Sequence, residues 1–247
     1  MIPRVLIGIG AAALLAVAGA DSARSERAGA AGAATAPAPI VEQMLVFRSG
    51  SAVTKRVRAR RVLVRVDRRR CAVGDGTPLA ALVRSRPGRV RLRDFGSCSR
   101  RPRDGAGLFV AAIGRDRNRG QDGWVYKVGR WAATAGAADP SGPFGRGRLR
   151  AGQRVTWFYC RLRAATCQRT LEVRVTAEPG GLSATVRGYD DEGRGVAVGG
   201  ATVTAGGVSA LTGADGRARL SLPTGMYRVV AAKPGLVRSF AERVEVP

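Results

Sequence analysis

The sequence predicts a mainly β protein, with an α+β N-terminal domain that contains one short helix and an all-β sandwich as the C-terminal domain. Three observations lead to this fold class. Apolar and polar residues alternate with period two in several runs, most clearly in 123–128 and 155–159. Residues rich in glycine and proline separate these runs. A helix start is recognisable in one stretch only, at residues 76–83.

The first twenty residues have the layout of a secretory signal peptide. Arg4 supplies the basic start, an apolar run follows from Val5 to Val17, and the small residues 18–20 suit a cleavage site. The alternative is an uncleaved membrane anchor, for which the apolar run is rather short, since a spanning helix needs about 20 such residues. We therefore expect a secreted or cell-envelope-associated protein.

A tether and two domains are expected after the signal peptide. Residues 21–39 are rich in Ala, Gly, Ser and Pro and offer little to bury, which is typical of a flexible linker. The rest of the chain is long enough for two small domains, which we place at 40–178 and 182–247. The joint between them is expected at the Glu178-Pro179-Gly180-Gly181 sequence.

The first domain is expected to alternate strands with one helix. Thr77 can cap that helix through its hydroxyl, and Pro78 suits the first helical position because its missing N–H needs no partner there. Pro87 and Gly88 lie beyond its end. The strands expected here are 62–66, 90–92, 108–113, 123–128, 155–159 and 170–175.

Residues 116–123, Asp-Arg-Asn-Arg-Gly-Gln-Asp-Gly, have the oxygen-bearing side chains of a calcium loop. An EF-hand loop needs Gly at its sixth position and Glu at its twelfth, where Gln121 and Lys127 stand. Arg117 and Arg119 would also repel a cation. The stretch therefore favours a plain turn over a metal site.

The second domain is expected to consist of strands joined by tight turns. Turn sequences recur at 199–200, 213–216 and 223–225. The strands expected between them are 182–187, 201–205, 217–222, 227–232 and 241–246.

The strand Gly123-Trp124-Val125-Tyr126-Lys127-Val128 and the later Leu149-Arg150-Ala151-Gly152-Gln153-Arg154-Val155-Thr156-Trp157-Phe158-Tyr159 resemble the transcobalamin C-terminal-like domain. That family's Asn and acidic residue are missing, because Gly129 and Gln153 occupy those positions. The family has no general assigned function. The resemblance implies an aromatic surface over a small planar or sugar-like ligand, and the ligand-binding candidates are Trp124, Tyr126, Trp157 and Tyr159.

The second domain resembles the carboxypeptidase regulatory-like, transthyretin-like β-sandwiches. Residues 200–203, 212–218 and 222–235 carry this resemblance. It implies a sandwich fold and, for function, a spacer or adhesion unit in an exported protein.

Four cysteines in an exported chain predict two disulfides. Of the three possible pairings, we favour Cys71 with Cys98 and Cys160 with Cys167, the second clamping the base of a hairpin. Zinc binding is disfavoured, because no Cys-x-x-Cys sequence and no histidine is present.

The chain has 42 basic and 18 acidic residues and a formal net charge of +24. Only three of the basic residues are lysines, a bias that a GC-rich coding sequence would produce without selection for binding. The alternative is functional, since clustered guanidinium groups attract polyanions. The candidates for polyanion binding are Arg56, Arg58, Arg60 and Arg61.

The chain contains no histidine, which excludes Ser-His-Asp and Cys-His catalysis as well as histidine-ligated metal hydrolases. Carboxylate-pair chemistry is formally left, but the densest acidic stretch, 190–192, lies between glycines and indicates a turn. We therefore expect no enzyme and no cofactor. Two functions stay open: a secreted non-catalytic module that binds a small ligand on an aromatic face, or an envelope protein that binds anionic polymers. Recognition of a specific nucleic-acid sequence is not expected.

For each of the four aromatic residues the alternative to a ligand contact is a place in the core, since aromatic side chains dominate the packing of small sandwiches.

Overall fold

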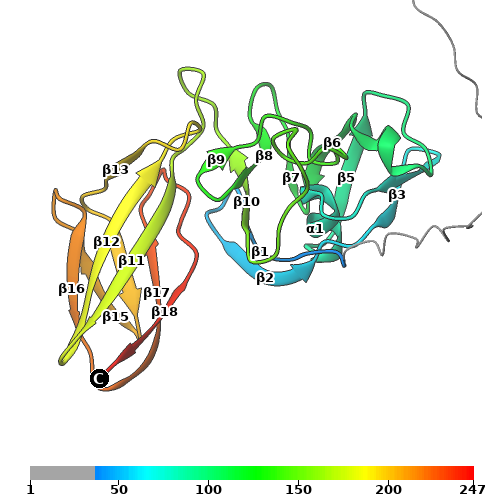
Figure 1. Cartoon of the computed structure of the whole chain (residues 1–247). Helices are drawn as coiled ribbons and strands as arrows, with labels where there is room; N and C mark the ends of the chain where they lie inside the picture. The colour runs from blue at the N-terminus through cyan, green and yellow to red at the C-terminus, as the bar shows by residue number, and fades with distance from the viewer. Residues whose placement is uncertain (1–36) are drawn as a thin grey trace, which may run out of the picture. The chain divides into compact units, whose positions relative to one another are not determined.

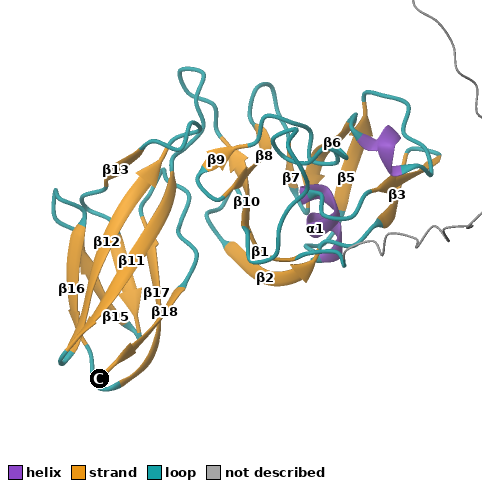
Figure 2. Cartoon of the chain, in the orientation of Figure 1, coloured by secondary structure: helices purple, strands orange, loops and turns teal. Residues whose placement is uncertain are grey.

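The computed structural model describes residues 37–247 (Figure 1). The predicted signal peptide and residues 21–36 of the predicted tether lie outside the described residues. Strands dominate the described part of the chain, whose helices are α1 (Pro78–Arg84) and a short 3-10 turn, η1 (Pro102–Gly105) (Figure 2). The prediction of a mainly β protein with one short helix is confirmed. No helix within residues 37–247 is long and apolar enough to span a membrane.

A five-stranded sheet organises the first half of the described chain. Its order is β2-β1-β10-β8-β9, with β1 (Ile40–Val46) and β10 (Arg154–Cys160) parallel and the remaining pairs antiparallel. The edge strands are β2 (Ala52–Arg58) and β9 (Trp131–Ala132), and β8 (Gly123–Val128) lies between β10 and β9.

Helix α1 packs on one face of this sheet, and its start matches the sequence prediction. The Thr77 hydroxyl accepts a hydrogen bond from the backbone N–H of Ala80 at 3.2 Å, and Pro78 is the first helical residue. Leu79 and Leu82 are fully buried. They pack in the first core, a cluster that also contains Ile113, Trp124, Tyr126, Val155, Trp157 and Tyr159.

Two smaller sheets complete the first half. The hairpin β3–β4 joins Val62–Val66 to Arg69–Val73. A three-stranded antiparallel sheet has the order β5-β6-β7, with β5 at Val90–Asp94, β6 at Leu108–Ile113 and β7 at Asp116–Arg117.

The second half is a β-sandwich, as predicted. One sheet contains β11 (Thr170–Glu178), β12 (Gly181–Tyr189), β13 (Gly195–Ala197) and β16 (Arg217–Ser221). The other has the order β15-β14-β17-β18. Its strands are Val208–Leu211, Thr202–Ala205, Gly225–Ala232 and Glu242–Val246 respectively. Apolar side chains of both sheets form the second core, which includes Val173, Val186, Val203 and Val229.

The expected joint at residues 178–181 lies inside a β-hairpin rather than between two sheets. Strands β11 and β12 pair over their full length, from Thr170 opposite Tyr189 to Glu178 opposite Gly181. Leu171 and Val173 of β11 belong to the second core. The strand assigned by sequence to the first domain therefore belongs to the sandwich, because its apolar face is buried there.

Both disulfides are the predicted pairs, Cys71–Cys98 and Cys160–Cys167, with Cα atoms 5.3 and 5.2 Å apart. The hairpin expected at the second bridge is confined to the loop between the two cysteines, where Arg163 and Thr166 form an antiparallel β-bridge and exchange backbone hydrogen bonds. The long strands on either side of this loop do not pair with each other. Cys160 ends β10, which pairs with β1 and β8, whereas β11 after Cys167 pairs with β12. The bridge thus joins the end of β10 to the segment that leads into β11, and it closes the base of the loop between them.

A turn precedes the Trp124 strand, as predicted: the backbone groups of Arg119 and Asp122 pair across it, between the short strand β7 and β8. The Asp116 carboxylate accepts a hydrogen bond from the backbone N–H of Arg48, and the Asp122 carboxylate accepts one from Leu162. The Asn118 side-chain oxygen accepts the N–H of Trp124. The oxygen-bearing side chains of this loop thus accept hydrogen bonds from backbone N–H groups of neighbouring segments.

Candidate functional site

The four aromatic residues of the predicted ligand face lie in the first core. Tyr126 on β8 stands opposite Trp157 on β10, and Trp124 stands opposite Tyr159. Their exposed fractions are 4 % for Trp124, 8 % for Tyr126, 1 % for Trp157 and 4 % for Tyr159. The structure therefore brings the four together, but as packing residues rather than as an open aromatic surface.

Hydrogen bonds fix three of these side chains. The Trp124 indole donates to the carbonyl of Asp116 at 2.9 Å, the Tyr126 hydroxyl to that of Ala135 at 2.7 Å, and the Tyr159 hydroxyl to that of Arg117 at 2.9 Å. The indole N–H of Trp157 is buried without a hydrogen-bond partner among the described residues. Such an unpaired donor is costly in a core.

A cavity of about 290 Å³ lies beside this cluster. Tyr126, Trp157 and Trp124 line it together with Phe109, Val110 and Ala135. It has room for a small molecule, although it is below the usual volume of drug-sized ligand pockets, about 300–1,000 Å³.

The predicted polyanion-binding arginines are all exposed. Arg56 and Arg58 are two residues apart on the edge strand β2 and therefore project from the same face. Arg60 and Arg61 follow the strand. The guanidinium of Arg58 donates to the carbonyl of Ala38, and that of Arg61 to the carbonyl of Arg100. Within residues 37–247 none of the four forms an ion pair with a carboxylate.

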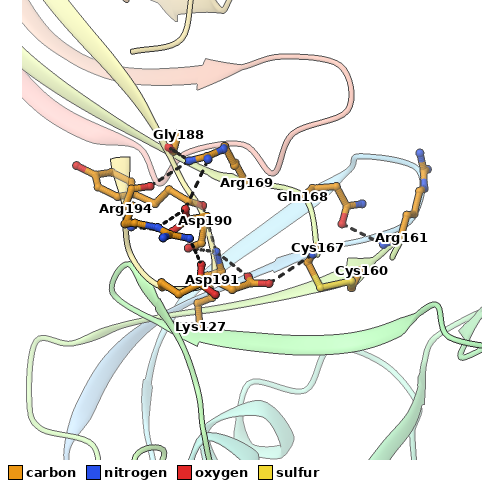
Figure 3. Close-up of polar contacts among 12 residues, drawn as sticks. Lys127, Cys160, Arg161, Cys167, Gln168, Arg169, Gly188, Asp190, Asp191 and Arg194 are labelled. Atoms are coloured by element: carbon orange, nitrogen blue, oxygen red, sulfur yellow. Dashed lines mark hydrogen bonds and ion pairs between the residues drawn. A yellow bond between two sulfur atoms is a disulfide. The ribbon is translucent and has the colours of Figure 1, made fainter. Parts of the chain in front are cut away.

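A buried lysine is the polar feature that sequence reasoning missed. Lys127 projects from the face of β8 opposite to Tyr126 and is 0 % exposed. Its ammonium group donates to the carbonyls of Tyr189 at 3.1 Å and Asp190 at 2.7 Å, and lies 3.1 Å from the Asp191 carboxylate (Figure 3). Burial lowers the pKa of Lys127, and the charge of Asp191 opposes that shift.

Arginines surround the neighbouring carboxylate of Asp190 (Figure 3). Arg194 contacts it at 3.1 Å and Arg169 at 3.5 Å, while Arg169 also donates to the carbonyl of Gly188. Desolvation raises the pKa of Asp190, but hydrogen bonds and charge from Arg194 outweigh it, so the pKa is lowered. The acidic turn predicted at 190–192 therefore follows β12 directly, and its first two residues contact the ammonium group of Lys127.

One sequence signal could have pointed to Lys127. The chain contains three lysines among 42 basic residues, and Lys127 is the one within the alternating aromatic strand. Its partners, by contrast, lie more than sixty residues later, so no local pattern connects them.

The arrangement offers no metal site in the described part of the chain, where no group of three or more Cys, Asp or Glu side chains converges. Comparison with family models, with curated proteins and with solved structures found no match. The two family resemblances therefore stay predictions.

Proposed function

We propose that the protein is an exported, non-catalytic module that binds anionic envelope polymers through exposed arginines. One observation carries this proposal. The aromatic residues expected to form a ligand face are buried in the first core, whereas Arg56, Arg58, Arg60 and Arg61 are exposed. Those four have no carboxylate partner within the described residues, so their charges are free to attract an anion.

The distribution of the carboxylates strengthens the argument. The chain contains 18 acidic and 42 basic residues, so most arginines have no acidic residue with which to pair. Many of these carboxylates are already engaged with other basic residues, as Asp190, Asp191 and Glu172 are with Arg194, Lys127 and Arg130. Polyanions bind such surfaces by releasing condensed counterions.

Export is supported by the signal-like N-terminus and by two disulfides, which persist in oxidising compartments. The absence of histidine from the sequence supports a non-catalytic role. In this proposal the C-terminal sandwich acts as a spacer that carries the arginine-bearing region.

Heparin serves as the test polyanion. The quadruple variant R56S/R58S/R60S/R61S should bind heparin more weakly than the wild type, with a shallower dependence of affinity on salt. A matched variant, R217S/R219S/R228S/R243S, removes the same charge from exposed positions of the sandwich. Equal losses in the two variants would mean that net charge alone governs binding, and the proposed site would be rejected.

The cavity beside Tyr126 and Trp157 favours a second candidate function, the binding of a small ligand. The unpaired indole N–H of Trp157 is a donor that a ligand could satisfy. Native mass spectrometry of the purified mature protein tests this candidate. A retained small molecule, accompanied by quenching of tryptophan fluorescence with weak salt dependence, would support it over polyanion binding.

A further inference from the structure

A second basic surface lies on the three-stranded sheet β5–β6–β7. Its arginines belong to a different sheet from those of β2 and follow them in the sequence. The sheet has a hollow of about 420 Å³ on one side. Arg91, Arg93 and Arg117 line it together with Phe109 and Asp67. Three cations and one carboxylate thus surround the same space.

Strand register explains why the arginines converge. Arg91 on β5 and Arg117 on β7 both stand opposite Ala112 of β6, one on each side. Arg93 stands opposite Phe109. Directly opposed residues of antiparallel strands project from the same face, with Cβ atoms about 5 Å apart. The sheet therefore places the three arginines on one face, around a hollow in which Asp67 supplies the one carboxylate of the lining.

These charges are not neutralised by the described part of the protein. Arg89, Arg91, Arg93 and Arg117 form no ion pair within residues 37–247. The nearby Asp94 carboxylate is engaged, because it pairs with Arg69 and accepts the backbone N–H groups of Gly96 and Cys98. The charges of Arg117 and Arg89 lower the pKa of Arg91, as expected for mutually repelling cations.

Two exposed phenyl rings lie next to these arginines, and Phe109 stands directly opposite Arg93. Phe109 is 43 % exposed and Phe95 is 75 % exposed, and their ring centroids are 5.8 Å apart with an interplanar angle of 65°. Phenylalanine is usually buried, so an exposed pair is an informative departure. Exposed aromatic rings beside arginines without ion-pair partners suit a ligand that contains both planar bases and phosphate groups. Bases stack on aromatic side chains, and guanidinium groups bind phosphates through paired hydrogen bonds.

We propose that the hollow with Arg91, Arg93 and Arg117 and the Phe95–Phe109 pair bind single-stranded nucleic acid without sequence preference. The phosphates occupy the arginine-lined hollow and one or more bases stack on the phenyl rings. A polyanion without planar bases would bind to the arginines, but it would make no stacking contact with the phenylalanines. This site goes beyond the proposed function, because it needs neither the arginines of β2 nor an envelope polymer.

The test uses the full chain and a fluorescently labelled oligothymidylate of about eight nucleotides, within the usual range of site sizes. An abasic oligomer of equal length and charge is the comparison ligand. The wild type should prefer the oligothymidylate, and Phe109→Ala should weaken its binding about ten-fold while leaving the abasic oligomer unaffected. Phe95→Ala, at the more exposed ring, should act in the same direction and guards against a folding defect in the first variant.

The double variant R91Q/R117Q should weaken binding of both oligomers and reduce the slope of log affinity against log salt by roughly 1.4, as two lost phosphate contacts require. R217Q/R219Q removes the same charge from exposed positions of β16 and should leave the slope near the wild-type value. Equal affinity of the wild type for the two oligomers, or no effect of either phenylalanine change, would overturn the proposal.

Failure here is distinguishable from failure of the proposed function. If R56S/R58S/R60S/R61S weakens both heparin and oligothymidylate binding while the Phe109 and Arg91/Arg117 variants do not, the β2 arginines bind polyanions and this site is rejected. If heparin does not bind but the oligothymidylate does, with the expected variant effects, the proposed function is rejected and the nucleic-acid site on β5–β6–β7 is supported.

Discussion

The ammonium group of Lys127, on β8 of the five-stranded sheet, lies 3.1 Å from the carboxylate of Asp191, which follows β12 of the sandwich. The same ammonium donates to two carbonyls at the end of β12. Lys127 is completely buried, whereas the Asp191 side chain is 28 % exposed. One cation thus satisfies three acceptors at the meeting point of two sheets.

Replacing Lys127 by Met should lower the free energy of unfolding by about 2–3 kcal/mol, because the acceptors lose their donor while partly buried. Urea unfolding followed by circular dichroism measures this change. The control is Arg163→Met, whose guanidinium is 78 % exposed and 3.8 Å from Asp122. That exposed pair should contribute at most about 1 kcal/mol. Equal effects of the two changes would contradict the role given to Lys127.

The free energy of unfolding should decrease in strong alkali, because the buried hydroxyl of Tyr126 stays protonated in the folded state. Burial, with the charge of Asp139, raises the pKa of this hydroxyl above its usual value. The unfolded tyrosine loses its proton near pH 10 while the folded one keeps it, so unfolding becomes more favourable above that pH, by about 1.4 kcal/mol per pH unit. Tyr126→Phe should remove this part of the decline, at a cost of about 1 kcal/mol at neutral pH for the lost bond to Ala135.

Unfolding curves from neutral pH to about pH 11, compared for the wild type and Tyr126→Phe, measure this effect, which begins only above the unfolded pKa of about 10. Tyr227→Phe is the control, since the Tyr227 hydroxyl bonds the Pro223 carbonyl at an exposed turn. An identical alkaline decline in the wild type and Tyr126→Phe would show that Tyr126 does not cause it.

Trp157→Ala should lower the free energy of unfolding by about 3–5 kcal/mol, as expected for a large side chain removed from a core. Trp157 is 1 % exposed, whereas the control residue Trp131 is 53 % exposed. Trp131→Ala should therefore cost much less. Thermal unfolding of both variants decides the matter, and a small effect at Trp157 would reopen the idea of an aromatic ligand face.

A fragment that begins at Gln168 should unfold cooperatively, and one that begins at Leu182 should not. The shorter fragment lacks β11, whose Leu171 and Val173 fill part of the second core. It also loses the backbone bonds that join Leu171 and Arg169 to Val237. Chemical unfolding of the two fragments measures the difference. Cooperative unfolding of the shorter one would show that the sandwich core does not need β11.

Most strands and the helix could be predicted because their signals are local. The Thr77 cap, the period-two alternation of 123–128 and the turns of the sandwich depend on neighbouring residues. Strand β4 was missed, since Arg68 to Arg70 hide the start of a strand whose remaining residues are small or apolar. The short strand β15 lacks a clear alternation and was missed as well.

The candidate site could be predicted only in part, because burial depends on distant segments. Alternation places Trp157 and Phe158 on opposite faces of β10, but it does not say that both faces are covered. In the structure Trp157 faces the first core, while Phe158 packs with Phe240 and Val237 from the C-terminal region. The alternating aromatic residues of this strand are compatible with a binding face, but in this protein they are packed in the core. The convergence of Arg91 and Arg117 likewise needs the register of three strands.

Strand β2 lies at the edge of its sheet, as its place in Figure 1 shows, and pairs only with β1. Its free backbone groups could recruit an identical strand from a second molecule, the usual start of aggregation. Lys55, Arg56 and Arg58 stand along that edge, so two molecules approaching edge to edge would bring like charges together. The cations proposed to bind a polymer therefore also oppose self-association, and a bound polyanion that neutralised them would remove that protection.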